Sequence, residues 1–180
     1  IRVQPDVVHF NCGIHDTKKS KTTGKFQVSP EEYEKNLRAI VERLDFAFET
    51  TLGGGTMTRL IGAAAAAGFE VRMFYVGLAS PELHLARVRE RAAAGGHDIS
   101  EDDIRRRWRH SRMNLIKLMP DLKELRAYDN SADGDPKAGD APAPVLVLHL
   151  VDGDIVGPPD LGDTPRWARP VVAAALKRKN

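Results

Sequence analysis

Glu49 and the arginines of residues 87–112 are the side chains in this sequence whose types and spacing could perform chemistry. Glu49 ends an apolar segment, expected to be a buried strand, and is followed by Thr50 and Thr51. Ligands of parallel α/β proteins gather at the carboxyl ends of strands, so this acid is a candidate for contact with a substrate. The same position is equally compatible with a helix N-cap or an ion pair to an arginine.

Arginines are concentrated on two expected helices that flank Gly95-Gly96. They are Arg87, Arg89 and Arg91 before the glycines and Arg105, Arg106, Arg107, Arg109 and Arg112 after them. One guanidinium group can bind two oxygens of a phosphate at once, and its charge neutralises the charge that develops in phosphoryl transfer. Helical periodicity lets only some of them point into one cleft, so most are expected to be solvated. The glycine-bounded segment is where a closing lid would lie.

Other residues with chemical potential are more ambiguous. The glycines at 53–55 could let backbone amides approach a ligand, or they could form a flexible turn before a helix. His97 is expected to be a cap or turn residue. No Gly-x-x-x-x-Gly-Lys-[Ser/Thr] phosphate loop occurs in the sequence; at Gly24-Lys25 the hydroxyl position is occupied by Phe26.

Composition limits the classes to which the chain can belong. A length of 180 residues with 42% apolar residues suits one domain with a proper core. The single cysteine, Cys12, excludes an internal disulfide and a multi-cysteine metal site, and it favours a cytoplasmic location. A net charge of +2 is weak support for nucleic-acid binding, and no apolar run is long enough for a membrane span. We therefore expect neither a nucleic-acid partner nor a membrane.

Strands and helices are expected to alternate along the chain. Strands are predicted at 5–10, 45–50, 71–78 and 125–128, and a hairpin at 145–151 and 154–156 around Asp152-Gly153. Helices are predicted from Ser29-Pro30 to residue 44, from the three glycines to Ala67, after Ser80-Pro81, at 101–119 and at 164–179. Residues 133–144 read as a loop, and Met113, Leu115, Leu118 and Met119 as core. This alternation predicts an α/β fold with a mostly parallel layered sheet flanked by helices.

Residues 45–180 closely resemble the zeta-toxin family of P-loop kinases. The match rests on the following segments: 46–52, 71–78, Ser80-Pro81-Glu82-Leu83, Gly95-Gly96-His97-Asp98-Ile99, 104–108 and Tyr128-Asp129-Asn130-Ser131. The resemblance implies a P-loop-kinase-like fold, here without the first strand and the phosphate loop. It also implies ATP and Mg²⁺ as cofactors, phosphorylation of a sugar nucleotide such as UDP-N-acetylglucosamine, and an antitoxin protein as a partner.

The resemblance also assigns roles to residues. Glu49, Thr50 and Thr51 would contact the sugar nucleotide, while Arg91, Arg105, Arg107 and Arg112 would be candidates for holding ATP or the transferred phosphate. It identifies no residue as the catalytic base. The chain would then be a kinase by family, and whether this chain is itself an enzyme stays open.

Residues 1–44 resemble a strand-loop-helix fragment of a GDSL/SGNH hydrolase. The match rests on residues 5–16, where His15 stands at the position of the usual asparagine, and on the helix expected after it. The family's nucleophilic serine block and its Asp-x-x-His block are not found, so no Ser-His pair can be assembled. Two alternatives to a kinase follow: a non-catalytic chimeric or truncated fragment, and an SGNH/GDSL esterase remnant.

Overall fold

The computed structural model describes residues 8–9, 35, 46–132, 134 and 143–178, which form two compact units, residues 1–50 and 51–180. In the first unit, β1 (Val8–His9) pairs in parallel with β2 (Phe46–Ala47). Lys35 is helical, in agreement with the helix predicted there. The rest of the elements expected for residues 5–44 lies outside the described residues, and the family join predicted after residue 44 stays a prediction.

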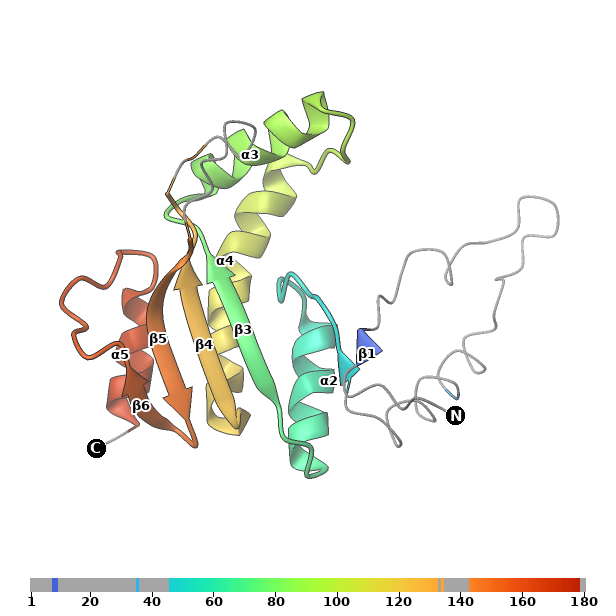
Figure 1. Cartoon of the computed structure of the whole chain (residues 1–180). Coiled ribbons are helices and arrows are strands. Elements are labelled where there is room, and N and C mark those ends of the chain that lie inside the picture. The colour runs from blue at the N-terminus through green and yellow to red at the C-terminus, as the bar shows by residue number, and fades with distance from the viewer. Residues whose placement is uncertain (1–7, 10–34, 36–45, 133, 135–142, 179–180) are drawn as a thin grey trace, which may run out of the picture. The chain divides into compact units, whose positions relative to one another are not determined.

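The second unit contains a four-stranded mixed sheet (Figure 1). Its strands lie in the order β3 (Arg72–Gly77), β4 (Glu124–Asp129), β5 (Val145–Val151) and β6 (Asp154–Gly157). β3 and β4 are parallel, whereas β4–β5 and β5–β6 are antiparallel. The α/β class is confirmed, and this sheet has one parallel pair, so it is mixed rather than mostly parallel.

The antiparallel β5–β6 pair follows from the predicted hairpin. Asp152 and Gly153, which connect β5 to β6, both have positive φ, 52° and 84°. Two consecutive residues of positive φ are what a type I′ turn requires, and an Asp-Gly pair adopts them readily. The turn chemistry therefore explains why the chain doubles back here without a crossover helix.

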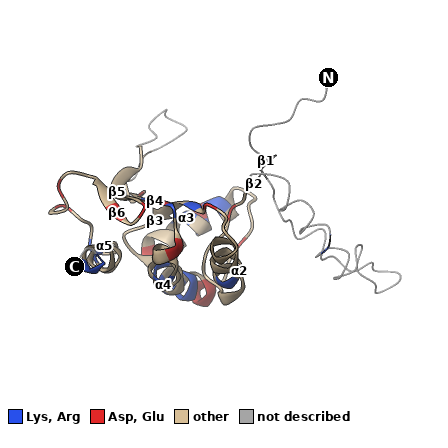
Figure 2. Cartoon of the chain, turned by 90° about the horizontal axis from the view of Figure 1, so that it is seen from below, with Lys and Arg blue, Asp and Glu red and all other residues tan. Residues whose placement is uncertain are grey.

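Helices cover one side of this sheet. α2 (Gly55–Ala66), α4 (Glu101–Leu118) and α5 (Arg169–Lys177) lie on the same side of the four strands (Figure 2). α3 (Pro81–Ala93) follows β3 and packs on α4 through Leu85, Val88 and Ile104. A short 3-10 helix, Met119–Asp121, ends α4. None of the described helices is both long and apolar enough to cross a membrane.

The core lies between α4, α5 and the helix-facing side of the strands. Leu115 of α4, Leu125 of β4, Leu148 of β5 and Val171 of α5 are at most 1% exposed. Leu115, Leu118 and Met119 are buried as predicted, but the prediction for Met113 is wrong, because its side chain is 60% exposed. The buried face of α4 passes through Ser111 and Leu115, and Met113 is two residues from Ser111, which places it on the opposite face of the helix.

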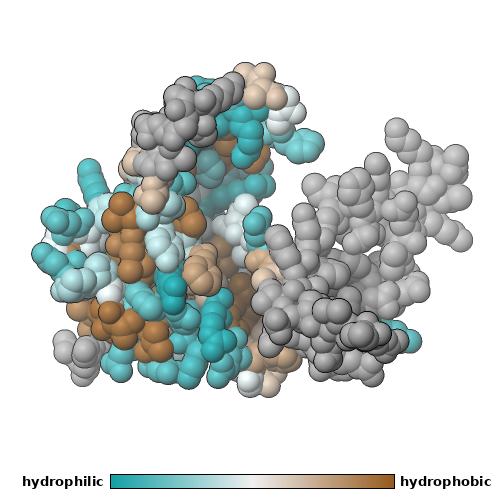
Figure 3. Space-filling model, in the orientation of Figure 1, coloured by the Kyte–Doolittle hydropathy of each residue, from teal (hydrophilic) through white to brown (hydrophobic). Residues whose placement is uncertain are grey.

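The other face of the sheet carries apolar and charged side chains together (Figure 3). On β3, Phe74 is 64% and Val76 57% exposed. Beside them on β4, Arg126 donates to Glu124 at 2.7 Å and its guanidinium lies 5.6 Å from the Phe74 ring centre. Alternation along the strands thus gives this face a mixed surface.

Local signals set most helix ends. The Ser80 hydroxyl oxygen accepts a hydrogen bond from Leu83 N–H at 3.1 Å at the start of α3, and Gly68, with φ of 91°, follows the end of α2. α5 begins at Arg169, later than the predicted residue 164. Pro170 has no N–H to donate, so it fits the first turn of a helix and not the interior of a longer one.

Replacing Ser80 with alanine should destabilise the second unit by about 1 kcal/mol, because Leu83 N–H at the start of α3 would lose its acceptor. Urea unfolding followed by circular dichroism measures this change. Ser80→Asp keeps an acceptor at the same place and should unfold close to the parent. Equal midpoints for the parent and the alanine variant would contradict the capping role.

Candidate functional site

The carboxyl ends of β3 and β4 lie at the same edge of the sheet because these strands are parallel. Beyond this edge, Asn130 N–H donates to the Gly77 carbonyl at 3.0 Å and Ala79 N–H donates to the Ser131 hydroxyl at 2.7 Å. Ser131 in turn donates to the Asp129 carboxylate. These hydrogen bonds hold the segment after β3 next to the segment after β4. The two segments together form the base of a candidate site.

Two tryptophans support this edge from the helix side. Trp108 Nε1 donates to the Leu78 carbonyl at 3.2 Å, and Trp167 Nε1 donates to Asp129 at 3.0 Å. Trp167 is 3% exposed and its ring lies directly against Gly77. Asp129 therefore has a structural role in which its carboxylate accepts from Trp167 and Ser131.

Arg112, one of the predicted phosphate-binding residues, contacts both of these tryptophans. Its guanidinium stacks 3.5 Å from the ring centre of Trp108 and donates to the carbonyls of Trp108 and Trp167 at 3.1 and 3.2 Å. Burial lowers the pKa of Arg112, which Tyr75 partly opposes. With its donors directed at carbonyls of the protein, Arg112 positions the two tryptophans.

Arg105 is also committed to partners within the protein. It donates to Glu82 on α3 at 2.7 Å and to Glu101 on its own helix at 2.8 Å. These hydrogen bonds raise the pKa of Arg105, and the bond from Arg105 is the largest cause that lowers the pKa of Glu82. Arg105 thus joins α3 to α4 at an exposed position, and a ligand phosphate would have to compete with two carboxylates.

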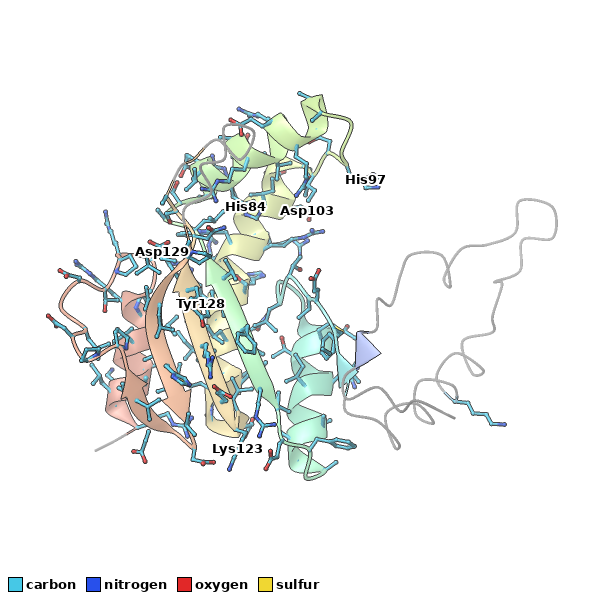
Figure 4. All side chains as sticks on the ribbon, in the orientation of Figure 1. His84, His97, Asp103, Lys123, Tyr128 and Asp129 are labelled. Atoms are coloured by element: carbon cyan, nitrogen blue, oxygen red, sulfur yellow. The ribbon has the colours of Figure 1, made fainter. Side chains whose placement is uncertain are left out.

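The remaining predicted arginines, Arg91 and Arg107, surround a histidine that the sequence analysis did not select. Burial first, and then the charges of Arg91, Arg107 and Arg87, lower the pKa of the half-buried His84. These four side chains are called the arginine–histidine cluster below. His84 lies toward the end of the sheet that Asp129 occupies, and Lys123 lies at the opposite end (Figure 4).

The members of the cluster differ in how they are bound. Arg87 donates to the carbonyls of Asn130 and Ala132 at 2.7 and 2.9 Å, which ties α3 to the segment after β4. Arg107 is 34% exposed, and its nearest carboxylate oxygen, on Asp103, is 3.9 Å away. Arg91 is exposed, and within the described part of the chain its guanidinium has no hydrogen bond or ion pair. Arg91 and Arg107 therefore have donors available for a ligand.

Each of the two glycine segments noted in the sequence lies against a different arginine, the first against Arg107 and the second against Arg91. A Cβ placed on Gly53 would come within 2.7 Å of Arg107 Cγ, and a Cβ on Gly96 within 2.8 Å of Arg91 Cγ. On α4, Asn114 also holds the first segment by donating to the Leu52 carbonyl at 2.8 Å. The glycines are thus required for close approach of the backbone to the arginine stems.

Replacing Gly53 with alanine should displace Arg107, because the new methyl group would overlap the side-chain stem and approach the helix backbone. Overpacking of this kind costs about 1–3 kcal/mol, so thermal unfolding should shift downward and phosphate binding should weaken together. Gly54→Ala is the matched control, since no atom of the described residues lies within 4 Å of its Cβ position. A Gly53→Ala protein that matches the Gly54→Ala protein in both measurements would contradict this packing.

The predicted substrate residues are exposed. Glu49 and Thr50 follow β2 in the first unit, and Thr51 begins the second. Their contact with a sugar nucleotide stays a prediction. His97 lies in the loop between α3 and α4, after the turn at residues 94–95 and before the cap residue Ser100. Cys12 and His15 lie outside the described residues.

Two other features bear on ligands. Among the described residues, no group of three or more histidine, cysteine, aspartate or glutamate side chains could hold a metal ion. A shallow hollow of about 310 Å³ lies at the opposite end of the sheet and is lined by Phe69, Lys123, Asp152 and Arg178, among others. An ion pair of 2.7 Å between Lys123 and Asp152 crosses its wall.

Comparison with known proteins leaves the family open. No family model matches the chain, and no solved structure matches it. Over 70 residues the chain is 36% identical to an uncharacterized protein of Haemophilus influenzae. The aligned segment covers 39% of this chain and 50% of that protein. The chain thus spans about half the length of the relative, whose description states no activity.

Proposed function

We propose that this chain binds the phosphate groups of a nucleotide as part of a zeta-toxin-like kinase. The observation that supports this most is the grouping of Arg87, Arg91 and Arg107 around His84. Guanidinium groups bind phosphate oxygens in pairs, and the grouping lies on helices that follow the carboxyl end of a parallel strand, where α/β proteins bind ligands. Arg91 and Arg107 take the phosphate-binding role, whereas Arg105 and Arg112 hold the site together.

The proposed reaction is transfer of the γ-phosphoryl group of ATP to a hydroxyl of a sugar nucleotide such as UDP-N-acetylglucosamine. Glu49, with Thr50 and Thr51, contacts the sugar nucleotide in this proposal. Arg91 and Arg107 neutralise charge on the transferred group and orient it. Mg²⁺ would enter with the ATP phosphates, since the described residues offer cations for phosphate and no carboxylate set for a metal. An antitoxin protein is the proposed partner, and the cytoplasm the proposed location.

A second candidate is a non-catalytic chain that binds phosphate without transferring it, as expected of a chimeric or truncated fragment. The sequence lacks a Gly-Lys-[Ser/Thr] phosphate loop, and two of the four predicted phosphate ligands are bound to protein groups. The esterase alternative rests on residues 1–44, which lie almost wholly outside the described part of the chain.

Phosphorus NMR of the chain with ATP, Mg²⁺ and UDP-N-acetylglucosamine separates these functions. The kinase proposal expects a new phosphomonoester resonance that is lost in the Glu49→Gln and Arg107→Ala proteins. Broadened ATP resonances without a new product would favour the non-catalytic binder. If the chain leaves the spectra of both nucleotides unchanged at concentrations near 1 mM, an affinity that corresponds to about −4 kcal/mol, the proposed function is wrong.

A further inference from the structure

One face of α4 contacts the segment that leads into α2 at two places. At the first place, the side-chain amide of Asn114 donates to the Leu52 carbonyl at 2.8 Å, and its nitrogen lies 3.5 Å from the Gly54 carbonyl. At the second place, a Cβ on Gly53 would come within 2.7 Å of Arg107 Cγ. Asn114 is half-buried and follows Arg107 by seven residues, so the two side chains lie on the same face of the helix, two turns apart.

Leu52 has a backbone conformation that leucine seldom adopts. Its φ is 51°, in the left-handed region, and the residue is 3% exposed. In this region the Cβ of an L-residue crowds the following carbonyl oxygen, so surrounding contacts must hold the conformation. Burial of the side chain fixes where Leu52 lies but does not by itself set the direction of its carbonyl. The hydrogen bond from Asn114 sets that direction.

The conformation of Leu52 matters because Thr51 directly precedes it in the chain. Thr51, Leu52, Arg107 and Asn114 all belong to the second unit. The φ angle of Leu52 is one of the two soft dihedrals of that residue, so a change in φ would turn Thr51 to a new place relative to α4. Arg107 would keep its place, since α4 itself carries it.

This inference rests on the function proposed above, in which Thr51 contacts the sugar nucleotide and Arg107 binds phosphate. We propose that Asn114 is a positioning residue of that site. Its amide holds Leu52 in the left-handed conformation and thereby sets the place of Thr51 relative to Arg107. Asn114 therefore acts on binding of the sugar nucleotide and not on binding of ATP.

Calorimetry on the full chain with two ligands tests this role. Asn114→Leu keeps the approximate size of the side chain and removes its donors. We expect it to weaken binding of UDP-N-acetylglucosamine by about tenfold, the upper range for one lost hydrogen bond, and to leave Mg-ATP binding within about twofold of the parent. Met113→Ala, at the neighbouring exposed position of α4, is the control and should leave both affinities unchanged.

Asn114→Asp supplies a readout that a loss of packing would not produce. The ionised carboxylate has the shape of the amide but no donor for the Leu52 carbonyl, so sugar-nucleotide binding should be weak at about pH 7.5. Protonation gives the carboxyl group one O–H donor, and a carbonyl oxygen beside it favours the protonated form. Affinity relative to the parent at the same pH should therefore recover as the pH falls toward about 5, whereas Asn114→Leu should show no recovery.

Four results would overturn the role of Asn114. Sugar-nucleotide affinity in Asn114→Leu that matches the parent would do so and leave the proposed function standing. Equal losses for both ligands, together with a lower unfolding midpoint, would show that Asn114 only supports the fold. Absence of recovery in Asn114→Asp would show that the donor is not the cause. If the parent itself does not bind the sugar nucleotide, the role also fails, while the phosphorus NMR assay judges the kinase proposal separately.

Discussion

Replacing Gly77 with alanine is expected to destabilise the second unit by about 3 kcal/mol, near the upper end for an overpacked core site. A Cβ at this position would lie 2.3 Å from Cη2 of Trp167 and 2.5 Å from two further atoms of the ring. Trp167 cannot move away easily, since it is 3% exposed and donates to Asp129 at 3.0 Å. The added methyl group would therefore disturb the edge of the sheet on which the candidate site is built.

Urea unfolding monitored by tryptophan fluorescence measures this effect. Gly62→Ala, within helix α2, is the matched control: among the described residues, its Cβ would meet Leu118 of α4 at 3.7 Å, an ordinary contact distance. It should stabilise the protein by about 0.5–1 kcal/mol, because alanine is the better helix former. Combining Gly77→Ala with Trp167→Leu should recover part of the loss if the clash is its cause. A Gly77→Ala protein as stable as the parent would show that Trp167 does not pack against this glycine.

The second large effect is expected at Arg107 and Arg91. Each alanine substitution should weaken ATP binding by about 1.5–3 kcal/mol, the range for hydrogen bonds to charged groups, which is a loss of tenfold or more. Isothermal titration calorimetry measures the change. Both variants should unfold close to the parent, because these guanidinium groups are not bound tightly within the protein.

Arg89→Ala is the control for this pair. Arg89 is on the same helix as Arg91 and has the same charge, but its side chain is 72% exposed, and the Glu101 carboxylate lies 3.8 Å from its guanidinium. If removing Arg89 weakens ATP binding as much as removing Arg91 or Arg107, the effect is one of net charge and the cluster has no special role.

The elements that local signals specify could be predicted from the sequence. Ser80-Pro81, Gly68 and Asp152-Gly153 lie at element boundaries where caps, a positive φ or a type I′ turn are needed, and the structure uses each of them in that way. The α/β class and the parallel β3–β4 pair follow from the order of these elements. The predicted start of α5 at residue 164 is too early, because Pro170 belongs to the first turn of a helix that begins at Arg169.

The candidate site was harder to predict because it depends on contacts between distant residues. Arg105 and Arg112 have the residue type for phosphate binding, but their partners Glu82 and the Trp167 carbonyl come from other elements. The close fit of Trp167 on Gly77 likewise has no signal in either local sequence. His84 was missed although a signal was present, since its spacing of three and seven residues from Arg87 and Arg91 puts all three on one face.

Amide shift mapping with ATP on the isotopically labelled chain tests the central claim most directly, because it locates the phosphate without relying on any variant. The account predicts that the amides of residues 53–55, His84, Arg91, Gly96 and Arg107 shift together. Amides around the hollow at Lys123, Asp152 and Arg178 should remain unchanged. Shifts confined to that hollow, or none near the arginine–histidine cluster at saturating ATP, would contradict the account.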